Sequence, residues 1–221
     1  PPQPHTRSFD RAHVYALELV PRNAELIAAL SRACGVQDAV TVRAIAVSNA
    51  SGEMRMPVNE ATRRYGHEVA QLAGPASTRR GPPMEVVNGT SLDDFLDRTD
   101  SAELRQNLQH CSIDTEGWDA LVLEGFHKTL AARRVPTLSF EYIARGYWRH
   151  PMMRLSPRSR AARTPACGEG GQFPPMEQRR LGEVLERLTS FGYACFFQVA
   201  GGGLVPASVP CWHPRYANVG W

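Results

Sequence analysis

The chain has 221 residues, of which 43% are hydrophobic and 21% are charged, and this composition excludes a disordered polyelectrolyte. Its apolar stretches reach only about five or six residues, whereas a membrane-spanning helix needs roughly 20. The formal net charge of +3 is too small to indicate binding to nucleic acid. We therefore expect a domain with an ordinary hydrophobic core, and neither a nucleic-acid partner nor a membrane.

The first quarter of the chain predicts strands around a helix. Residues 1–12 hold three prolines and no alternating pattern, so we expect an irregular segment before a domain that spans 13–221. A strand over 13–19 precedes Pro21, which suits the first turn of a helix, and Gly35 is placed to end that helix. The β-branched residues of 39–48 predict a second strand, followed by a turn at 49–52 and a short return strand at 53–58.

Predicted strands and helices also alternate in the rest of the chain. Residues 59–83 predict a loop and 84–88 a strand, and Thr90 or Ser91 is placed to cap a helix over 92–96. A strand ends at 112–114, a single helix is expected over 117–134, and 136–142 predict the next strand. Residues 151–175 form an Arg-, Pro- and Gly-rich insertion that we expect to be flexible. An amphipathic helix around Leu181–Leu188 and a closing hairpin of 192–199 with 204–209 complete the chain.

Strands that alternate with helices indicate an α/β fold with a mostly parallel sheet, to which the terminal hairpin adds an antiparallel edge. In open parallel sheets, ligands bind beyond the carboxyl ends of the strands. Three acids stand at such ends, namely Glu18, Asp114 and Glu141. A single acid there is often only a helix cap or a solvated residue, but three at successive strand ends indicate a site. A carboxylate in the position of Glu18 can accept both hydroxyls of a ribose.

Five segments carry a resemblance to a known family. They are VYALELVPRNAELIAAL (14–30), AVSNASGEMRM (46–56), TSLDDFL (90–96), IDTEGWDALVLEG (113–125) and TLSFEY (137–142). In this order they resemble FkbM-type methyltransferases, which use S-adenosylmethionine (SAM) and belong to the Rossmann-like class I. The resemblance covers roughly residues 13–145, and IDTEGWDALVLEG is its most specific part. It implies a Rossmann-like sheet and a SAM-dependent methyltransferase.

The resemblance also implies roles for individual residues. Glu18 matches the acid that holds the ribose of SAM, and Ala46, Val47 and Ser48 match the stretch that lies against the adenine. Asp114 falls where the family strand ends beside the methyl group, so it is the first candidate to orient or deprotonate an acceptor, and Glu116 is the second.

The T-x-L-D pattern of Thr90, Leu92 and Asp93 is also shared with the family, and we interpret it as structural capping rather than catalysis. The acceptor implied is a hydroxyl of a small molecule or a glycan.

One departure from the family pattern concerns the start of the chain. The family opens with a strand and a glycine-rich turn that cradles the methionine part of SAM, whereas this chain has PPQPHTRSFDRA before its first predicted strand. We therefore expect an N-terminally truncated sheet, in which the strands that end at Glu18 and Asp114 flank the position of the absent strand. Glu18 and Asp114 then form a half-site.

Other residue types predict no further chemistry. The five cysteines form no C-x-x-C pair and no histidine cluster has metal-ligand spacing, so we expect no metal site. Cys34, Cys111 and Cys195 lie in apolar segments and are expected to be small buried residues. The arginines of 154–163 are either a phosphate-binding loop or a solvated one, and His150 is an alternative base.

Two other functions are compatible with these patterns. One is a methyltransferase-like module that binds another chain without catalysis, which the absence of the glycine turn favours. The other is a nicotinamide-binding oxidoreductase, which also places an acid after its second strand but leaves I-D-T-E-G unexplained.

Overall fold

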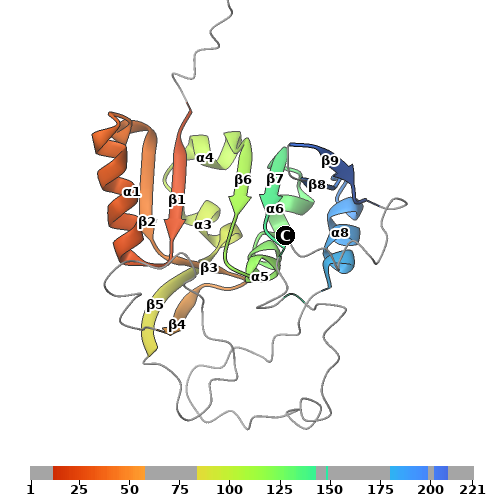
Figure 1. The fold of residues 1–221 in the computed structure, drawn as a ribbon, viewed down its shortest axis with the longest axis horizontal. Coiled ribbons are helices and arrows are strands. Elements are labelled where there is room, and N and C mark those ends of the chain that lie inside the picture. Colours follow the sequence, from red (N-terminus) through yellow and green to blue (C-terminus); the bar gives the residue numbers. More distant parts are fainter. Residues whose placement is uncertain (1–11, 58–83, 143–147, 149–179, 199–201, 209–221) are drawn as a thin grey trace, which may run out of the picture.

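The computed structural model describes residues 12–57, 84–142, 148, 180–198 and 202–208. The predictions for residues 1–11, the loop 59–83, His150, the insertion 151–175, Cys167 and Cys211 lie outside the described residues. The described part is a mixed α/β structure of small, mostly parallel sheets with an antiparallel C-terminal hairpin (Figure 1). The predicted α/β class is therefore confirmed at this level.

The elements alternate along the chain. The strands are β1 Val14–Glu18, β2 Val40–Ala44, β3 Ala46–Ser48, β4 Gly52–Pro57, β5 Met84–Ser91, β6 His110–Ile113, β7 Thr137–Phe140, β8 Phe196–Gln198 and β9 Leu204–Pro206. The helices are α1 Pro21–Ala33, η1 Gln37–Ala39, α3 Leu92–Arg98, α4 Ala102–Asn107, α5 Asp119–Glu124, α6 His127–Ala131 and α8 Leu181–Ser190. The sequence patterns did not predict α4.

Four sheets are formed by the described strands. β1 pairs with β2 and β6 pairs with β7, both in parallel register, while β8 and β9 form the predicted antiparallel hairpin. β5 lies between β3 and β4, parallel to the first and antiparallel to the second. Figure 1 shows β2, β1, β6 and β7 in this order across the view, with their carboxyl ends on the same side. Within the described residues, β1 pairs only with β2 and β6 only with β7.

The predicted single strand over residues 39–48 is wrong. It is interrupted at Ile45, so that β2 joins the sheet of β1 while β3 joins the sheet of β5. The amide of Ile45 donates a hydrogen bond to the carbonyl oxygen of Glu18 at 3.0 Å. The bend at Ile45 therefore distributes one β-branched run between two sheets.

The predicted single helix over residues 117–134 is also wrong, because it breaks at Gly125. The carbonyl oxygen of Gly125 accepts a hydrogen bond from the amide of Asp93 at 2.9 Å. A Cβ at Gly125 would collide with the backbone oxygen of Ser48, so the close approach of the chains requires glycine here. The carboxylate of Asp93 then accepts the amides of Lys128 at 2.8 Å and Thr129 at 3.0 Å. These contacts end α5 and start α6.

The caps of two other helices follow the predictions. Pro21 occupies the first turn of α1, and Gly35 adopts a φ of +70° just beyond the end of that helix. Ser91 caps α3, because its Oγ accepts the amide of Asp94 at 3.1 Å. Cys34, however, is exposed rather than buried, since the face of α1 that is buried carries Ala24 and Ser31. Cys111 and Cys195 are half-buried.

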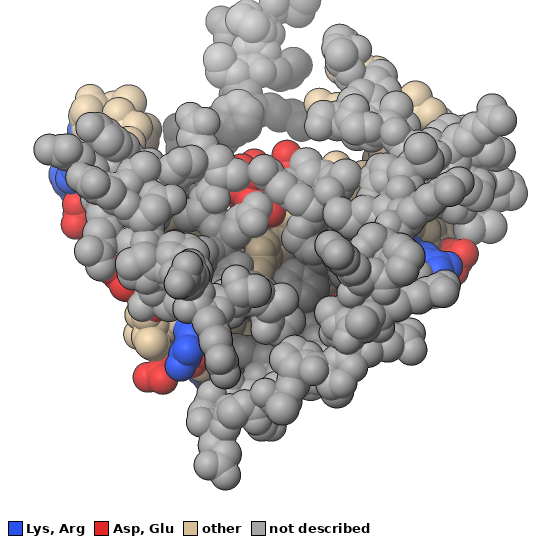
Figure 2. Space-filling model, turned by 60° about the horizontal axis from the view of Figure 1, so that its bottom comes forward, with Lys and Arg blue, Asp and Glu red and all other residues tan. Residues whose placement is uncertain are grey.

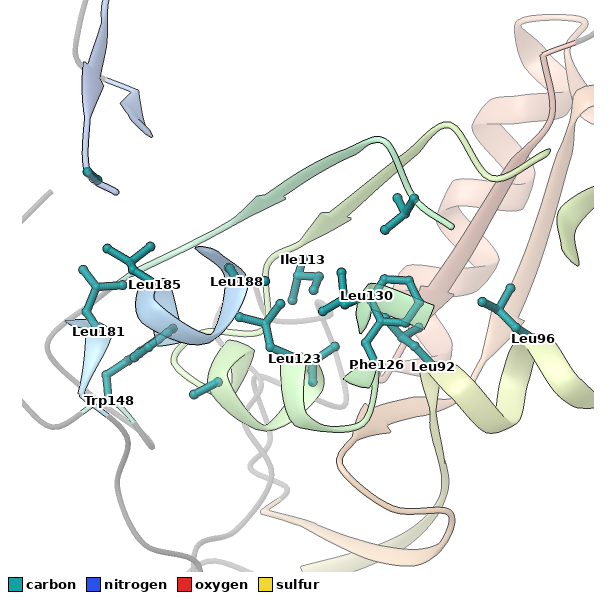
Figure 3. Close-up of a cluster of buried hydrophobic side chains, with 14 residues drawn as sticks. Leu92, Leu96, Ile113, Leu123, Phe126, Leu130, Trp148, Leu181, Leu185 and Leu188 are labelled. Atoms are coloured by element: carbon teal, nitrogen blue, oxygen red, sulfur yellow. The ribbon is translucent and has the colours of Figure 1, made fainter. Parts of the chain in front are cut away.

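The largest hydrophobic cluster joins helices that are far apart in the sequence. Its buried members on helices include Leu92, Leu123, Leu130, Leu185 and Leu188. Figure 3 shows these residues with Ile113 of β6 in one continuous group, and Trp148 beside Leu181 at one end. The indole of Trp148 is 1% exposed and stacks on Phe140, with ring centroids 5.9 Å apart. This core fixes the position of β6 and β7, and hence of the acids that follow them.

Candidate functional site

Glu18 is the last residue of β1, and its carboxylate is held by the backbone. Its Oε1 accepts a hydrogen bond from the amide of Val20 at 2.7 Å, while the side chain remains half-buried. Because Val20 precedes the first turn of α1, this contact orients the carboxylate at the junction between strand and helix. Glu18 is therefore fixed at the carboxyl edge of the β1–β2 pair.

Ala46, Val47 and Ser48 form β3, which begins directly after Ile45, the residue whose amide donates to the carbonyl oxygen of Glu18. Ala46 is 1% exposed and packs in a second cluster with Met54, Trp118 and Leu121, and Ser48 is 2% exposed. Val47 is partly buried against the main cluster. The side chains of Ala46 and Ser48 are thus part of the interior. The predicted contact with an adenine would therefore be made by the backbone of these residues, and it remains a prediction.

The buried cluster that contains both Ala46 and Trp118 connects the segments that carry the two halves of the predicted site. Trp118 follows the loop that begins with Asp114 and contains Glu116 and Gly117. Asp114 is exposed as the first residue after β6, and Glu116 is half-buried. Glu116 and Gly117 adopt φ angles of +56° and +96°, which turn the chain sharply before α5. Glu18 and Asp114 are therefore attached to segments that share one core.

Asp119 is a residue that the sequence analysis did not single out. Its side chain is 0% exposed, and its carboxylate accepts three hydrogen bonds. Thr115 Oγ1 and the amide of Gly117 donate to Oδ2 at 3.1 and 3.3 Å, and the amide of Glu141 donates to Oδ1 at 3.1 Å. Asp119 thus holds the loop after β6 against the residue that follows β7. An acid in the first turn of a helix is so common that the sequence offered no distinct signal.

Asp114 and Glu141 form an acidic pair at adjacent strand ends. Ile113 and Phe140 are partners in the register of β6 and β7, and each acid is the next residue. Burial, and next the negative charge of Asp114, raise the pKa of Glu141. Its Oε2 is buried, and no described residue donates a hydrogen bond to it. Figure 2, which looks at the molecule from below the view of Figure 1, shows a group of Asp and Glu atoms in its upper middle.

No group of three or more His, Cys, Asp or Glu side chains in the described part of the chain is arranged to hold a metal ion. None of the described helices is both long and apolar enough to cross a membrane. Comparison with protein-family models, with curated proteins and with solved structures finds no match for this chain.

The pKa of Asp119 predicts how stability changes with pH. Burial raises this pKa from its ordinary value of 3.8 to about 6, although the hydrogen bonds to the carboxylate oppose the shift. The folded state therefore binds the proton more tightly than the unfolded chain. The corresponding stabilisation, about 3 kcal/mol, is present below about pH 4 and is lost as the pH rises through about 6.

We expect Asp119→Asn to remove this contribution from the pH dependence. The variant should also be less stable at low pH, because an amide nitrogen in place of Oδ2 cannot accept from Gly117. Urea unfolding of both proteins between about pH 4 and 7 measures the difference in slope. Asp97→Asn, at an exposed position of α3, is the matched control and should keep the slope of the parent. Equal slopes for Asp119→Asn and the parent would contradict the prediction.

Proposed function

We propose that this chain is a SAM-dependent methyltransferase with a Rossmann-like sheet, similar to the FkbM type. The observation that carries the proposal is that both acids adjoin segments of one buried cluster. The amide of Ile45, next to Ala46, donates to the carbonyl oxygen of Glu18, and Trp118 follows the loop that begins with Asp114. In open parallel sheets, ligands bind beyond the carboxyl ends of the strands, and the proposed site takes one carboxylate from the end of β1 and another from the residue after β6. The arrangement of β2, β1, β6 and β7 in Figure 1 is compatible with such a sheet.

The donor half of the site is assigned to Glu18 and the neighbouring β3. The amide of Val20 fixes one carboxylate oxygen of Glu18, which orients the group to accept the hydroxyls of a ribose. The backbone of Ala46–Ser48 follows Ile45, whose amide donates to the carbonyl oxygen of Glu18, and it is the proposed surface for the adenine. The family's glycine-rich turn has no counterpart in the described residues that would hold the methionine part.

The acceptor half is assigned to Asp114 and Glu141, with Glu116 as a further candidate. SAM, when bound, supplies a methyl group on a positively charged sulfur. That group would serve as the methyl donor to an acceptor hydroxyl, and the task left to the residues of this chain would be to orient the hydroxyl and take up its proton. An ordinary carboxylate is a weak base at neutral pH, but burial and Asp114 raise the pKa of Glu141. We therefore assign proton uptake to the Asp114–Glu141 pair, acting on a hydroxyl of a small molecule or a glycan.

Calorimetric titration with SAM tests the proposal. We expect binding in the micromolar range, and Glu18→Gln should weaken it at least tenfold, because the amide lacks the charge that accepts two ribose hydroxyls. Glutamine keeps an acceptor for the amide of Val20, so the junction with α1 should remain folded.

Glu25→Gln is the matched control, since the side chain of Glu25 is 68% exposed on α1 and pairs with Arg22. It should bind SAM like the parent. If titration of the parent protein with SAM gives no heat, the proposal that the chain is a methyltransferase is contradicted. That result would favour the module that binds another chain without catalysis. Equal binding by Glu18→Gln and the parent would contradict the assigned ribose site.

A further inference from the structure

A pocket of about 650 Å³ lies beside the β1–β2 pair, and its lining includes Ala44 and Ile45, which adjoin the backbone of Glu18. Its lining comes from β1 and β2, from α3 and the residues after it, and from β4 and β5. Tyr15 of β1 and Phe95 of α3 cross it as an edge-to-face pair with ring centroids 6.4 Å apart. Neither Glu18 nor Asp114 lines this pocket. Its volume lies in the range that small-molecule sites occupy.

Gly52 leaves room for the pocket on the side of β4 and β5, whereas the space beside the α-carbon of Gly89 is filled by the side chain of Met54. Gly52 and Gly89 are directly opposed in the antiparallel register of these strands, and both line the pocket. A Cβ at Gly52 would meet no atom within 4 Å, so the absence of a side chain there leaves open space. The backbone at this point is thus accessible to a ligand.

The polar lining combines cations with groups that bind hydroxyls. Arg43 of β2 and Arg98 of α3 are both exposed at the pocket. Arg98 is 72% exposed and its pair with Asp94 is long, at 3.9 Å, so little of its charge is neutralised there. Guanidinium groups bind phosphate or carboxylate through paired hydrogen bonds. Asn88 adds an amide, and Glu53 and Asp100 add carboxylates, which are groups that bind sugar hydroxyls.

We propose that this pocket binds a monosaccharide that carries an anionic group, either a phosphate or a carboxylate. Arg43 and Arg98 hold the anion, and the rings of Tyr15 and Phe95 contact the apolar face of the sugar. Asn88 and Glu53 hydrogen-bond its hydroxyls. The lining of the pocket includes neither Glu18 nor Asp114, and the proposal does not depend on methyl transfer.

Titration calorimetry with four probes tests the proposal: glucose 6-phosphate, glucuronate, glucose and inorganic phosphate. We expect glucose 6-phosphate or glucuronate to bind with a dissociation constant of about 1 mM or below. Glucose and inorganic phosphate should each bind at least tenfold more weakly, since each lacks half of the contacts. Preference for one of the two anionic sugars identifies whether the anion is phosphate or carboxylate.

Two variants locate the site. Arg43→Gln and Arg98→Gln should each weaken binding of the anionic sugar about tenfold, because each removes a charge-assisted hydrogen bond. Arg22→Gln, at an exposed position of α1 outside the pocket, is the matched control and should bind like the parent. The parent is titrated with SAM and with the anionic sugar in separate experiments, so a failure of this proposal is distinguished from a failure of the methyltransferase proposal.

Several results would overturn the proposal. No binding of either anionic sugar at about 10 mM would do so. If glucose binds as tightly as the anionic sugars, the arginines do not contribute to binding. If inorganic phosphate binds equally tightly, the pocket does not recognise the sugar. Unchanged binding in both arginine variants would place the ligand elsewhere. Far-ultraviolet circular dichroism of the variants confirms that they are folded.

Discussion

Phe126→Ala is expected to lower the free energy of unfolding by about 3–5 kcal/mol. Phe126 is 1% exposed and lies in the main cluster, near Leu92 and Leu130 (Figure 3). Its removal would leave a cavity between α3, α5 and α6, and these helices are anchored by backbone contacts that restrict collapse into the space. Thermal or urea unfolding, followed by circular dichroism, measures the loss.

Phe196→Ala provides the comparison for the same side-chain deletion at an exposed position. Phe196 of β8 is 51% exposed, so its replacement should change the free energy of unfolding by less than about 1 kcal/mol. A loss at Phe126 no larger than the loss at Phe196 would show that the helices do not pack as described.

Asp93→Ala should destabilise the protein by about 2–4 kcal/mol. The carboxylate of Asp93 is buried and accepts the first amides of α6, from Lys128 and Thr129. Alanine leaves both donors without this partner in the interior, at the end of a helix where the dipole also favours a negative charge. The expected signal is a lower midpoint of urea unfolding, with an unchanged slope.

Asp97→Ala is the control for Asp93→Ala, because Asp97 is an exposed aspartate of the same helix α3. Its effect should stay within about 0.5 kcal/mol. Because Asp93 is assigned to structure, any SAM affinity measured for the folded Asp93→Ala protein should equal that of the parent. A selective loss of SAM binding without loss of stability would instead make Asp93 part of the site.

The sequence predicted elements wherever a local signal was strong. Pro21 and Gly35 bracket α1 because their backbone preferences suit the first turn and the exit of a helix. The spacing of Leu181, Leu185 and Leu188 gave α8, and all three are buried. The glycines between its two predicted strands indicated the closing hairpin. Each of these signals acts within a few residues and needs no knowledge of distant partners.

Local signals failed where a distant contact decides the outcome. The run over 117–134 has the periodicity of one helix, yet Asp93 and the backbone at Ser48 divide it at Gly125. The run over 39–48 reads as one strand, but the carbonyl oxygen of Glu18 holds the amide at its bend. The partners lie between about 27 and 77 residues away in sequence, so no local pattern contains them.

In the candidate site, too, local signals were visible in the sequence and long-range contacts were not. The sequence placed Glu18, Asp114 and Glu141 at strand ends, because an apolar run followed by an acid is visible without a structure. It did not indicate that Asp119 holds the loop of Asp114 to the backbone of Glu141. It also did not indicate the pocket between Tyr15 and Phe95, whose lining combines residues from five elements.

The sequence by itself determined the α/β class, the order of its main strands and the positions of the acids, because side-chain periodicity and backbone preference are local properties. Only the tertiary structure decided which runs divide between sheets, which carboxylates are buried caps and which lie at a common edge. The physical reason is that burial and hydrogen bonding depend on partners brought together by packing. Asp93 and Asp114 each precede or begin a helical segment in the sequence, yet packing buries the first under α6 and exposes the second beside Glu141.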